Sequence, residues 1–252
     1  MAQITSQLIT ARNTLEAKGK EFVLMITPNK ECIYGLSYMS DDYPVVRQPT
    51  RSDMVVEYLR DKTDLRIVYP KEELLEKIQE NDDKNFYFKS DTHWNHLGAY
   101  IGARQLLLEL GITLPTIEEL EITENKGYSG DLVKMMGLSK YIKNDWDYIL
   151  TGYSEDSKIN KEYMEELEDP EKFVRYSTVG KDDRQICVLR DSYTTSMTPY
   201  ITSQFNVCYL LHRGIYTPEL LAETKADIVV LQVVEREIES LLTFTVETDC
   251  AW

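Results

Sequence analysis

Three side chains that can carry out acyl transfer stand at two separate points of the sequence. Asp91 and His93 lie in the segment KSDTHWN, and Ser192 follows Asp191 much later, in LRDSYTT. In an extended loop, residues i and i+2 point the same way, so Asp91 can accept the Nδ1–H of His93. The Nε2 of His93 is then free to take a proton from the Ser192 hydroxyl. These residue types therefore predict a Ser-His-Asp triad.

Each of the two segments also has a plain structural interpretation. His93 taken alone is equally consistent with a residue that caps the helix after it. Ser192 taken alone is better explained as a turn residue, because Asp and Ser are common in turns and at helix N-caps. The pairing favours chemistry, because both segments follow predicted strands, and ligand sites collect at the carboxyl ends of the strands of such a sheet.

The elements that must position these residues alternate along the chain. Continuous apolar runs predict buried strands at 21–27, 65–69, 185–190, 206–211 and 227–232, with 85–88 as a short strand or extended segment before the histidine loop. Apolar spacing and glycine or proline signals predict helices at 3–19, 52–62, 70–79, 96–110, 196–204, 218–225 and 236–242. This alternation is typical of an α/β fold, a parallel sheet with helices on both faces.

The middle of the chain is less regular. Residues 146–153 and 173–180 show strand-like alternation of apolar and polar side chains. We interpret residues 112–184 as an insertion or lid that is carried on one domain spanning residues 1–252.

Composition excludes several classes of function. The net charge of −15 argues against nucleic acid and against an anionic membrane surface as partners. Cys187 and Cys208 fall in apolar runs, which indicates buried packing residues. No Cys/His metal pattern and no glycine-rich phosphate loop occurs, so the sequence predicts neither a metal nor a cofactor.

Several long segments resemble one known family. KSDTHWNHLGAYIGARQLL, LRDSYTTSMTPYITSQF and LHRGIYTPELLAETKADIVVLQVVERE are similar to blocks of the AlgX/AlgJ-type proteins, also called DHHW proteins. Residues 26–34 (ITPNKECIY) and 129–138 (SGDLVKMMGL) resemble further blocks, so the resemblance covers nearly the whole chain. Its most specific part is the Asp-x-His-Trp element with the Gly-Ala that follows.

The resemblance implies a three-layer αβα, SGNH-hydrolase-like (flavodoxin-like) fold with a circularly permuted motif order, in which Asp-x-His precedes the serine. It assigns Asp91 as the orienting carboxylate, His93 as the general base and Ser192 as the nucleophile. Two positions depart from the pattern. Arg190 stands where many SGNH enzymes have glycine. Thr92 stands at the second position of the DHHW signature in place of histidine, and we expect its side chain to point away from the triad.

The function that the resemblance implies is O-acetyl transfer to a cell-surface or secreted polysaccharide through an acyl-Ser192 intermediate. A carbohydrate esterase with the same triad is the first alternative, and a non-catalytic polysaccharide-binding or assembly module is the second. We expect the Ser192 N–H, with Arg213 or the Gly130 backbone, to receive the oxyanion. Arg213 is equally well explained by pairing with a carboxylate. The resemblance names neither the acyl donor nor the acceptor polymer.

Other polar residues have simpler explanations. We expect His96 to pack or cap, His212 to be structural, Trp94 to anchor the core beneath the histidine loop, and Asp131 to cap a helix. The resemblance also implies work outside the cytoplasm. Residues 1–20 are polar and helical rather than typical of a signal peptide, so this location requires an export signal or membrane anchor upstream.

Overall fold

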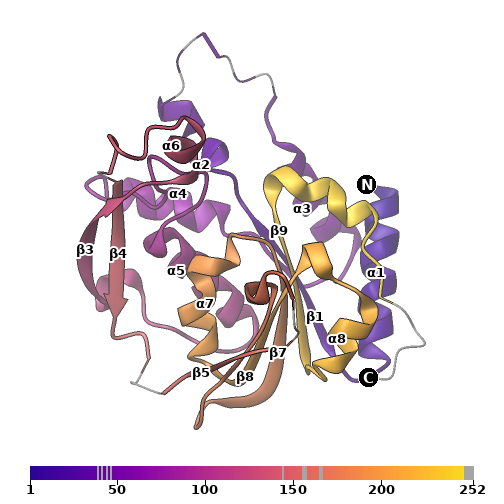
Figure 1. Ribbon diagram of the computed structural model, residues 1–252. Helices are drawn as coiled ribbons and strands as arrows, with labels where there is room; N and C mark the ends of the chain where they lie inside the picture. The colour runs from indigo at the N-terminus through magenta and orange to yellow at the C-terminus, as the bar shows by residue number, and fades with distance from the viewer. Residues whose placement is uncertain are drawn as a thin grey trace.

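The computed structural model describes residues 1–38, 40, 42–43, 45, 47–143, 145–154, 158–164 and 167–246. Its centre is a seven-stranded sheet (Figure 1). In spatial order the strands are β2 (Ile67–Val68), β1 (Glu21–Thr27), β9 (Ile228–Val234), β7 (Asp182–Arg190), β8 (Phe205–His212), β6 (Phe173–Ser177) and β5 (Asn160–Tyr163). All pairs from β2 to β8 are parallel, as predicted. The whole sheet is mixed, because β6 pairs antiparallel with β8 and β5 pairs antiparallel with β6.

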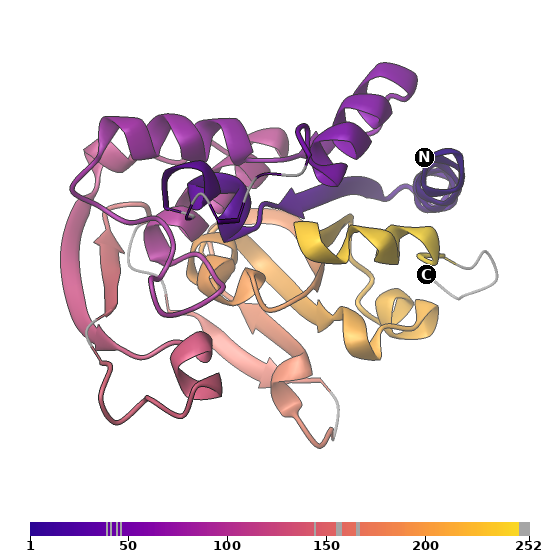
Figure 2. The same ribbon diagram turned by 90° about the horizontal axis from the view of Figure 1, so that it is seen from above.

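Helices cover both faces of the sheet and make a three-layer α/β structure (Figures 1 and 2). One face packs against α2 (Lys30–Tyr38), α4 (Lys71–Glu80), α5 (His96–Glu109) and α7 (Thr194–Thr202). The other face packs against α1 (Ala2–Glu16), α3 (Arg51–Lys62), α8 (Pro218–Glu223) and the 3₁₀ helix η4 (Glu235–Leu242). The apolar runs follow from this arrangement, since a strand covered on both faces buries every side chain, as β9 does.

Two helical segments differ from the sequence-based expectation. Residues 236–242 belong to the 3₁₀ helix η4 rather than to an α-helix. Helix α2 was not predicted, because KECIYGLSY contains glycine and few strong helix formers. Its buried Ile33 joins the core, which shows that packing rather than propensity holds this helix. The remaining 3₁₀ turns are η1 (Ile117–Glu119), η2 (Pro170–Lys172) and η3 (Arg213–Ile215).

The middle region contributes a second sheet beside α5. Strands β3 (Glu121–Tyr128) and β4 (Asp145–Thr151) pair antiparallel, and the short helix α6 (Asp131–Met135) lies in their connection. Tyr148 and Leu150 of β4 are buried in the same core as α5. Strand β3 could not be predicted from apolar alternation, because nearly all of its side chains are exposed.

The Gly-Ala signal after the histidine loop has a packing reason. Trp94 is fully buried, and its Nε1–H donates to the Tyr193 carbonyl at 2.9 Å, so it anchors the core as predicted. A Cβ on Gly98 would lie 2.2 Å from the Phe86 carbonyl oxygen, and one on Gly102 would lie 2.6 Å from the Trp94 ring. Only glycine lets α5 approach the loop this closely.

Gly98→Ala is expected to lower the free energy of unfolding by about 2 to 3 kcal/mol, measured by urea denaturation. Helix propensity alone would make alanine more favourable by about 1 kcal/mol, so the sign of the change separates the clash from propensity. The control is Leu108→Ala, because Leu108 is exposed on the same helix and should change stability by less than about 0.5 kcal/mol. A stabilised Gly98→Ala protein would contradict the packing argument.

Candidate active site

The two ends of the loop that carries Asp91 and His93 are hydrogen-bonded to each other. Residues 85–88 are the extended segment expected before the loop. They form a single bridge, between Tyr87 and Trp94, and do not join the main sheet. The Phe88 N–H donates to the His93 carbonyl at 3.2 Å. Helix α5 is capped by Asn95, whose side chain accepts from two backbone N–H groups, and not by His93. The His93 ring is therefore not used as a helix cap.

The turn that carries Ser192 is fixed by its neighbour Asp191. The buried Asp191 carboxylate accepts from the Tyr193 N–H at 2.9 Å and from the Val234 N–H at 2.7 Å. The Asp191 N–H donates to Gln232 at 2.9 Å. Because β7 ends just before this turn and α7 begins just after it, Ser192 is left exposed at the carboxyl end of the sheet.

The structure brings the three predicted side chains into one line of contacts. His93 Nδ1 lies 2.6 Å from Asp91 Oδ1, and His93 Nε2 lies 2.7 Å from Ser192 Oγ. An ionised carboxylate can only accept, so Nδ1 carries the proton and Nε2 accepts the serine O–H. This arrangement can remove a proton from Ser192 and hold the resulting imidazolium.

Asp91 has no spare acceptor capacity. Its carboxylate accepts from the His93 N–H, from His93 Nδ1, from the Tyr128 hydroxyl at 2.8 Å and from the Asp131 N–H at 2.9 Å. Burial raises the pKa of this carboxyl, but these hydrogen bonds outweigh burial and hold the pKa well below its usual range. Asp91 is therefore ionised wherever an imidazole can act as a base.

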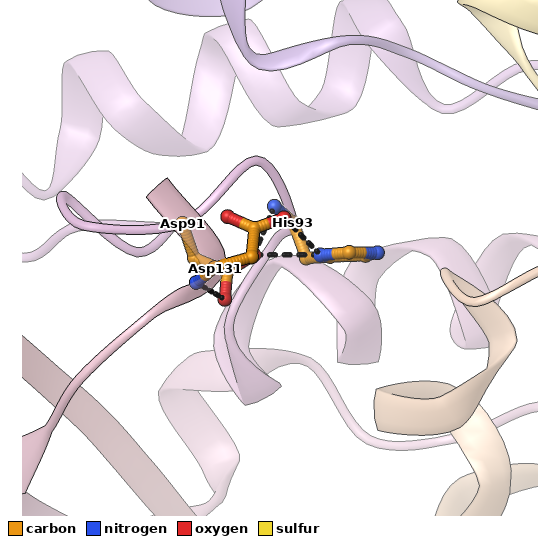
Figure 3. A group of neighbouring side chains, drawn as sticks. All are labelled: Asp91, His93 and Asp131. Atoms are coloured by element: carbon orange, nitrogen blue, oxygen red, sulfur yellow. Dashed lines mark hydrogen bonds and ion pairs between the residues drawn. The ribbon is translucent and has the colours of Figure 1, made fainter. Parts of the chain in front are cut away.

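A second carboxylate, Asp131, lies beside the pair (Figure 3). Asp131 Oδ2 is 3.7 Å from His93 Nδ1, and the Asp131 carboxylate accepts from the Thr92 N–H at 2.9 Å and from its hydroxyl at 2.6 Å. Thr92 was expected to point away from the triad, but its hydroxyl donates to Asp131 and lies 3.4 Å from His93 Nδ1. Asp131 does not cap α6 as predicted. It is the first residue of that helix, its N–H donates to Asp91, and its carboxylate is occupied by Thr92. The block SGDL marked this residue, but only the fold shows its neighbours.

The three side chains in Figure 3 also offer ligand atoms within 4.8 Å of one another, a spacing that a cation can use. The hydrogen bonds favour a different use. Asp91 already accepts four N–H or O–H groups, and His93 Nδ1 faces Asp91 with its proton. This donor set fits an oriented imidazole better than a metal ligand.

Lys30 of α2 binds main-chain carbonyls of the histidine loop. Its ammonium donates to the carbonyls of Phe88, Lys89 and Asp91 at 2.7, 3.0 and 3.0 Å. Three donors meet three acceptors, so the ammonium is fully used. Sequence reasoning missed Lys30, because a lysine that binds only main-chain oxygens far along the chain leaves no local pattern.

Tyr193 packs behind the imidazole. The ring centroids of His93 and Tyr193 are 4.8 Å apart, and the Tyr193 hydroxyl donates to the Thr92 carbonyl at 2.6 Å. The Arg236 guanidinium also lies over this ring, 5.2 Å from its centroid. The residue after the serine thus ties its turn to the histidine loop.

The two residues predicted to receive an oxyanion have other partners in this structure. Arg213 donates to Ser240 Oγ at 2.7 Å and to the Glu237 carboxylate. The Gly130 N–H donates to Ser90 Oγ at 3.0 Å. Their role as oxyanion donors stays a prediction, whereas no hydrogen bond of the Ser192 N–H is found within the part of the chain that the structure describes.

The two other histidines make structural contacts, as expected. His96 Nδ1 lies 2.8 Å from the Asp147 carboxylate, and His212 accepts from the Gly214 N–H at 3.0 Å. Cys187 and Cys208 are fully buried, as predicted. Burial raises the pKa of the Cys187 thiol to about 12, so this thiol does not compete as a nucleophile.

The sequence also matches a known family over most of this site. Residues 1–154 match the family model described as SGNH hydrolase-like domain, acetyltransferase AlgX. The chain belongs to this family. The match includes Asp91, His93 and Asp131, whereas Ser192 lies beyond the matched residues. The predicted resemblance and the SGNH-like α/β fold are thereby confirmed.

Solved structures share the fold of this SGNH-like chain at low sequence identity. A DHHW family protein from Eubacterium siraeum DSM 15702 superposes with a TM-score of 0.68 at 15% identity, covering 98% of this chain and 89% of the other. Bacillus cereus PatB1 gives 0.67 at 14% identity, covering 97% and 91%. The O-acetyltransferase domain of Pseudomonas putida AlgJ gives 0.59 at 15% identity, covering 96% and 84%. None of the curated proteins matches the sequence.

The helices do not include a candidate membrane span. Within the described residues, none is both long and apolar enough to cross a bilayer.

Proposed function

We propose that this protein is a serine-dependent O-acetyltransferase that modifies a cell-surface or secreted polysaccharide. The observation that carries the proposal is the continuous series of contacts from Asp91 through His93 to Ser192, at 2.6 and 2.7 Å. Membership of an acetyltransferase family supports the acetyl group. The AlgJ domain, an O-acetyltransferase by name, shares the fold.

The first half-reaction forms an acetyl-enzyme. His93 Nε2 takes the Ser192 proton as Oγ attacks the carbonyl carbon of an acetyl ester, and Asp91 stabilises the imidazolium that forms. The tetrahedral intermediate collapses when the imidazolium gives its proton to the leaving oxygen. One ester bond is broken, one is formed on Ser192, and His93 returns to its neutral state.

The oxyanion of this intermediate needs donors aimed at it. The Ser192 N–H is suited to this, because it borders the nucleophile and has no other partner within the described residues. Arg213 would have to leave Glu237, and the Gly130 N–H would have to leave Ser90, to join it. We therefore propose the Ser192 N–H as the first donor.

The second half-reaction passes the acetyl group to an acceptor hydroxyl. His93 takes the proton of a sugar hydroxyl as the sugar oxygen attacks the acetyl carbonyl. The imidazolium then gives this proton to Ser192 Oγ as the ester bond to Ser192 breaks, which restores the free serine and neutral His93. If water takes the place of the sugar, the same residues make a carbohydrate esterase. We further propose that the chain is one domain working outside the cytoplasm. In it, the part of residues 112–184 that forms β3, α6 and β4 is an insertion that reaches the site through Tyr128 and Asp131, whereas β5 and β6 belong to the main sheet.

The test is to follow acetyl transfer directly. The protein is incubated with p-nitrophenyl acetate, and we expect an acetyl adduct on the peptide that contains Ser192 by mass spectrometry. Added oligosaccharides should accelerate p-nitrophenol release and appear as acetylated products. If none of the sugars accelerates p-nitrophenol release while hydrolysis of p-nitrophenyl acetate continues, the result favours the esterase. Sugar binding without any acetyl adduct would select the binding module.

A sulfonyl fluoride provides an independent probe. PatB1, which shares this fold, has also been solved with a sulfonyl adduct. We expect the reagent to label Ser192 and to block p-nitrophenyl acetate turnover in the same proportion. Labelling at another residue, with turnover intact, would contradict Ser192 as the nucleophile.

A further inference from the structure

A short segment next to the site differs from the rest of this acidic chain. We define the α6 patch as the exposed side chains of α6 and the turn after it: Leu132, Lys134, Met135, Met136, Lys140, Tyr141 and Lys143. Figure 2 shows α6 at one edge of the molecule. The patch therefore has open access to a large partner.

The apolar members are held outward by the backbone. Met135 is 83% exposed, Met136 68% and Tyr141 82%. Val133 is buried and anchors the segment, while the Leu138 N–H donates to the Val133 carbonyl at 3.0 Å. Large apolar side chains grouped this way and bordered by polar residues mark an interaction surface.

The charge of the patch has the opposite sign to that of the protein. The chain carries a net −15, yet Lys134, Lys140 and Lys143 follow one another within this segment. Within the described residues, no ion pair of these three lysines is found. The carboxylate that begins α6, Asp131, already accepts from Thr92. The patch thus combines three exposed lysines with exposed apolar side chains.

We propose that the α6 patch docks on an anionic lipid bilayer. Met135, Met136 and Tyr141 enter the headgroup region, where apolar and amphipathic side chains are stable, and the lysines contact lipid phosphates. The chain as a whole carries a net charge of −15 and is repelled by such a bilayer, so contact is expected through a basic segment such as this patch. The net negative charge of the chain disfavours contact between the membrane and the rest of the protein. It does not disfavour contact through the patch.

Docking would fix the reacting groups relative to the membrane. The Asp131 N–H at the start of α6 donates to Asp91, and the Asp131 side chain holds Thr92 beside His93. A bilayer on the exposed side of α6 would therefore lie at a constant position with respect to His93 and Ser192. The proposal does not require the chemistry of Ser192, since it concerns only the surface of α6.

The test is sedimentation with vesicles. We expect the protein to bind vesicles of about 30% phosphatidylglycerol and 70% phosphatidylcholine, and to bind pure phosphatidylcholine vesicles much less. Lys134→Gln/Lys140→Gln/Lys143→Gln should lower the partition coefficient roughly 100-fold, because each lysine contributes about fivefold. Met135→Ser/Met136→Ser should lower it about 10-fold or more.

A tryptophan at position 141 reports insertion. In Tyr141→Trp, the emission should shift to the blue when anionic vesicles are added and should be quenched by brominated lipid. Val179→Ser and Lys158→Gln are matched controls at exposed positions away from the patch, and they should bind as the wild type does. Circular dichroism and p-nitrophenyl acetate turnover show that each variant is folded.

Four results would overturn the proposal. The first is that the wild type fails to bind anionic vesicles. The second is that the patch variants bind these vesicles as well as the wild type does. The lysine variants lose binding to polygalacturonate but not to vesicles, which would make the patch a contact for acidic glycans. The methionine variant converts a dimer into a monomer in sedimentation velocity, which would make it an interface between two copies. Ser192→Ala should bind vesicles normally, so a failure of the proposed chemistry is distinguishable from a failure of docking.

Discussion

Ser192→Ala is expected to lower kcat for p-nitrophenyl acetate by about 10³-fold or more, because the attacking oxygen is removed while the rest of the site remains. Ser192 Oγ lies 2.7 Å from His93 Nε2, and the Ser192 side chain is exposed. The substitution should therefore leave the fold unchanged. Turnover and urea unfolding are measured on the same preparation.

The matched control for this substitution is Ser196→Ala. Ser196 lies four positions further along, on α7, and is only partly buried. We expect both its turnover and its free energy of unfolding to stay close to the wild type. If Ser192→Ala and Ser196→Ala lose activity equally, or if Ser192→Ala retains it, Ser192 is not the nucleophile and another residue must be sought.

Asp91→Asn is expected to lower kcat/KM by about 10³- to 10⁴-fold at neutral pH. An amide has one acceptor oxygen in place of the carboxylate pair, so it cannot satisfy the four donors that Asp91 now accepts. It also lets His93 carry its proton on Nε2, where the imidazole can no longer accept from Ser192. The rate of labelling by a fluorophosphonate measures the loss at Ser192 directly.

Asp131→Asn is the control that separates orientation from general electrostatics. Asp131 is 3.7 Å from His93 Nδ1, and the contact it makes to Asp91 comes from its backbone N–H, which the substitution keeps. We expect a loss of only about 10-fold, in line with a carboxylate that acts without a direct hydrogen bond. A larger loss for Asp131→Asn than for Asp91→Asn would reverse the two roles.

The pH dependence of stability provides a second readout for Asp91. Its pKa in the folded protein is lowered, so ionised Asp91 stabilises the fold above the unfolded value of about 3.9. This contribution is lost as the pH falls through that value toward the folded pKa. The wild type should therefore lose stability in acid more steeply than Asp91→Asn. Parallel acid curves for the two proteins would contradict the burial of an ionised carboxylate here.

Local patterns were sufficient for most of the sheet. The strands β1, β7, β8 and β9 contain apolar runs that predicted them, and such runs occur where both faces of a strand are covered. The pattern could not reveal β3, whose side chains are mostly exposed, or the antiparallel direction of β6. Strand direction depends on which neighbour is available in space, and apolar alternation is the same either way.

The sequence by itself determined which residue types are available for chemistry at this site. The spacing Asp91-x-His93 places a carboxylate within reach of the imidazole, and this contact is local, so sequence order alone predicts it. The Asp191-Ser192 pair likewise carries its own turn-forming carboxylate.

Only the tertiary structure decided how the two segments meet and what supports them. The contact between His93 and Ser192 joins loops far apart in sequence, and it depends on the close packing of α5 against Trp94 and on the Tyr193 contact. Lys30 of α2 and Asp131 of α6 both bind the histidine loop. The Lys30 ammonium donates to a main-chain carbonyl of the loop, and Asp131 donates its own main-chain N–H to Asp91. Such partners leave no signal in the order of side chains, because their identity follows from where the folded backbone places them.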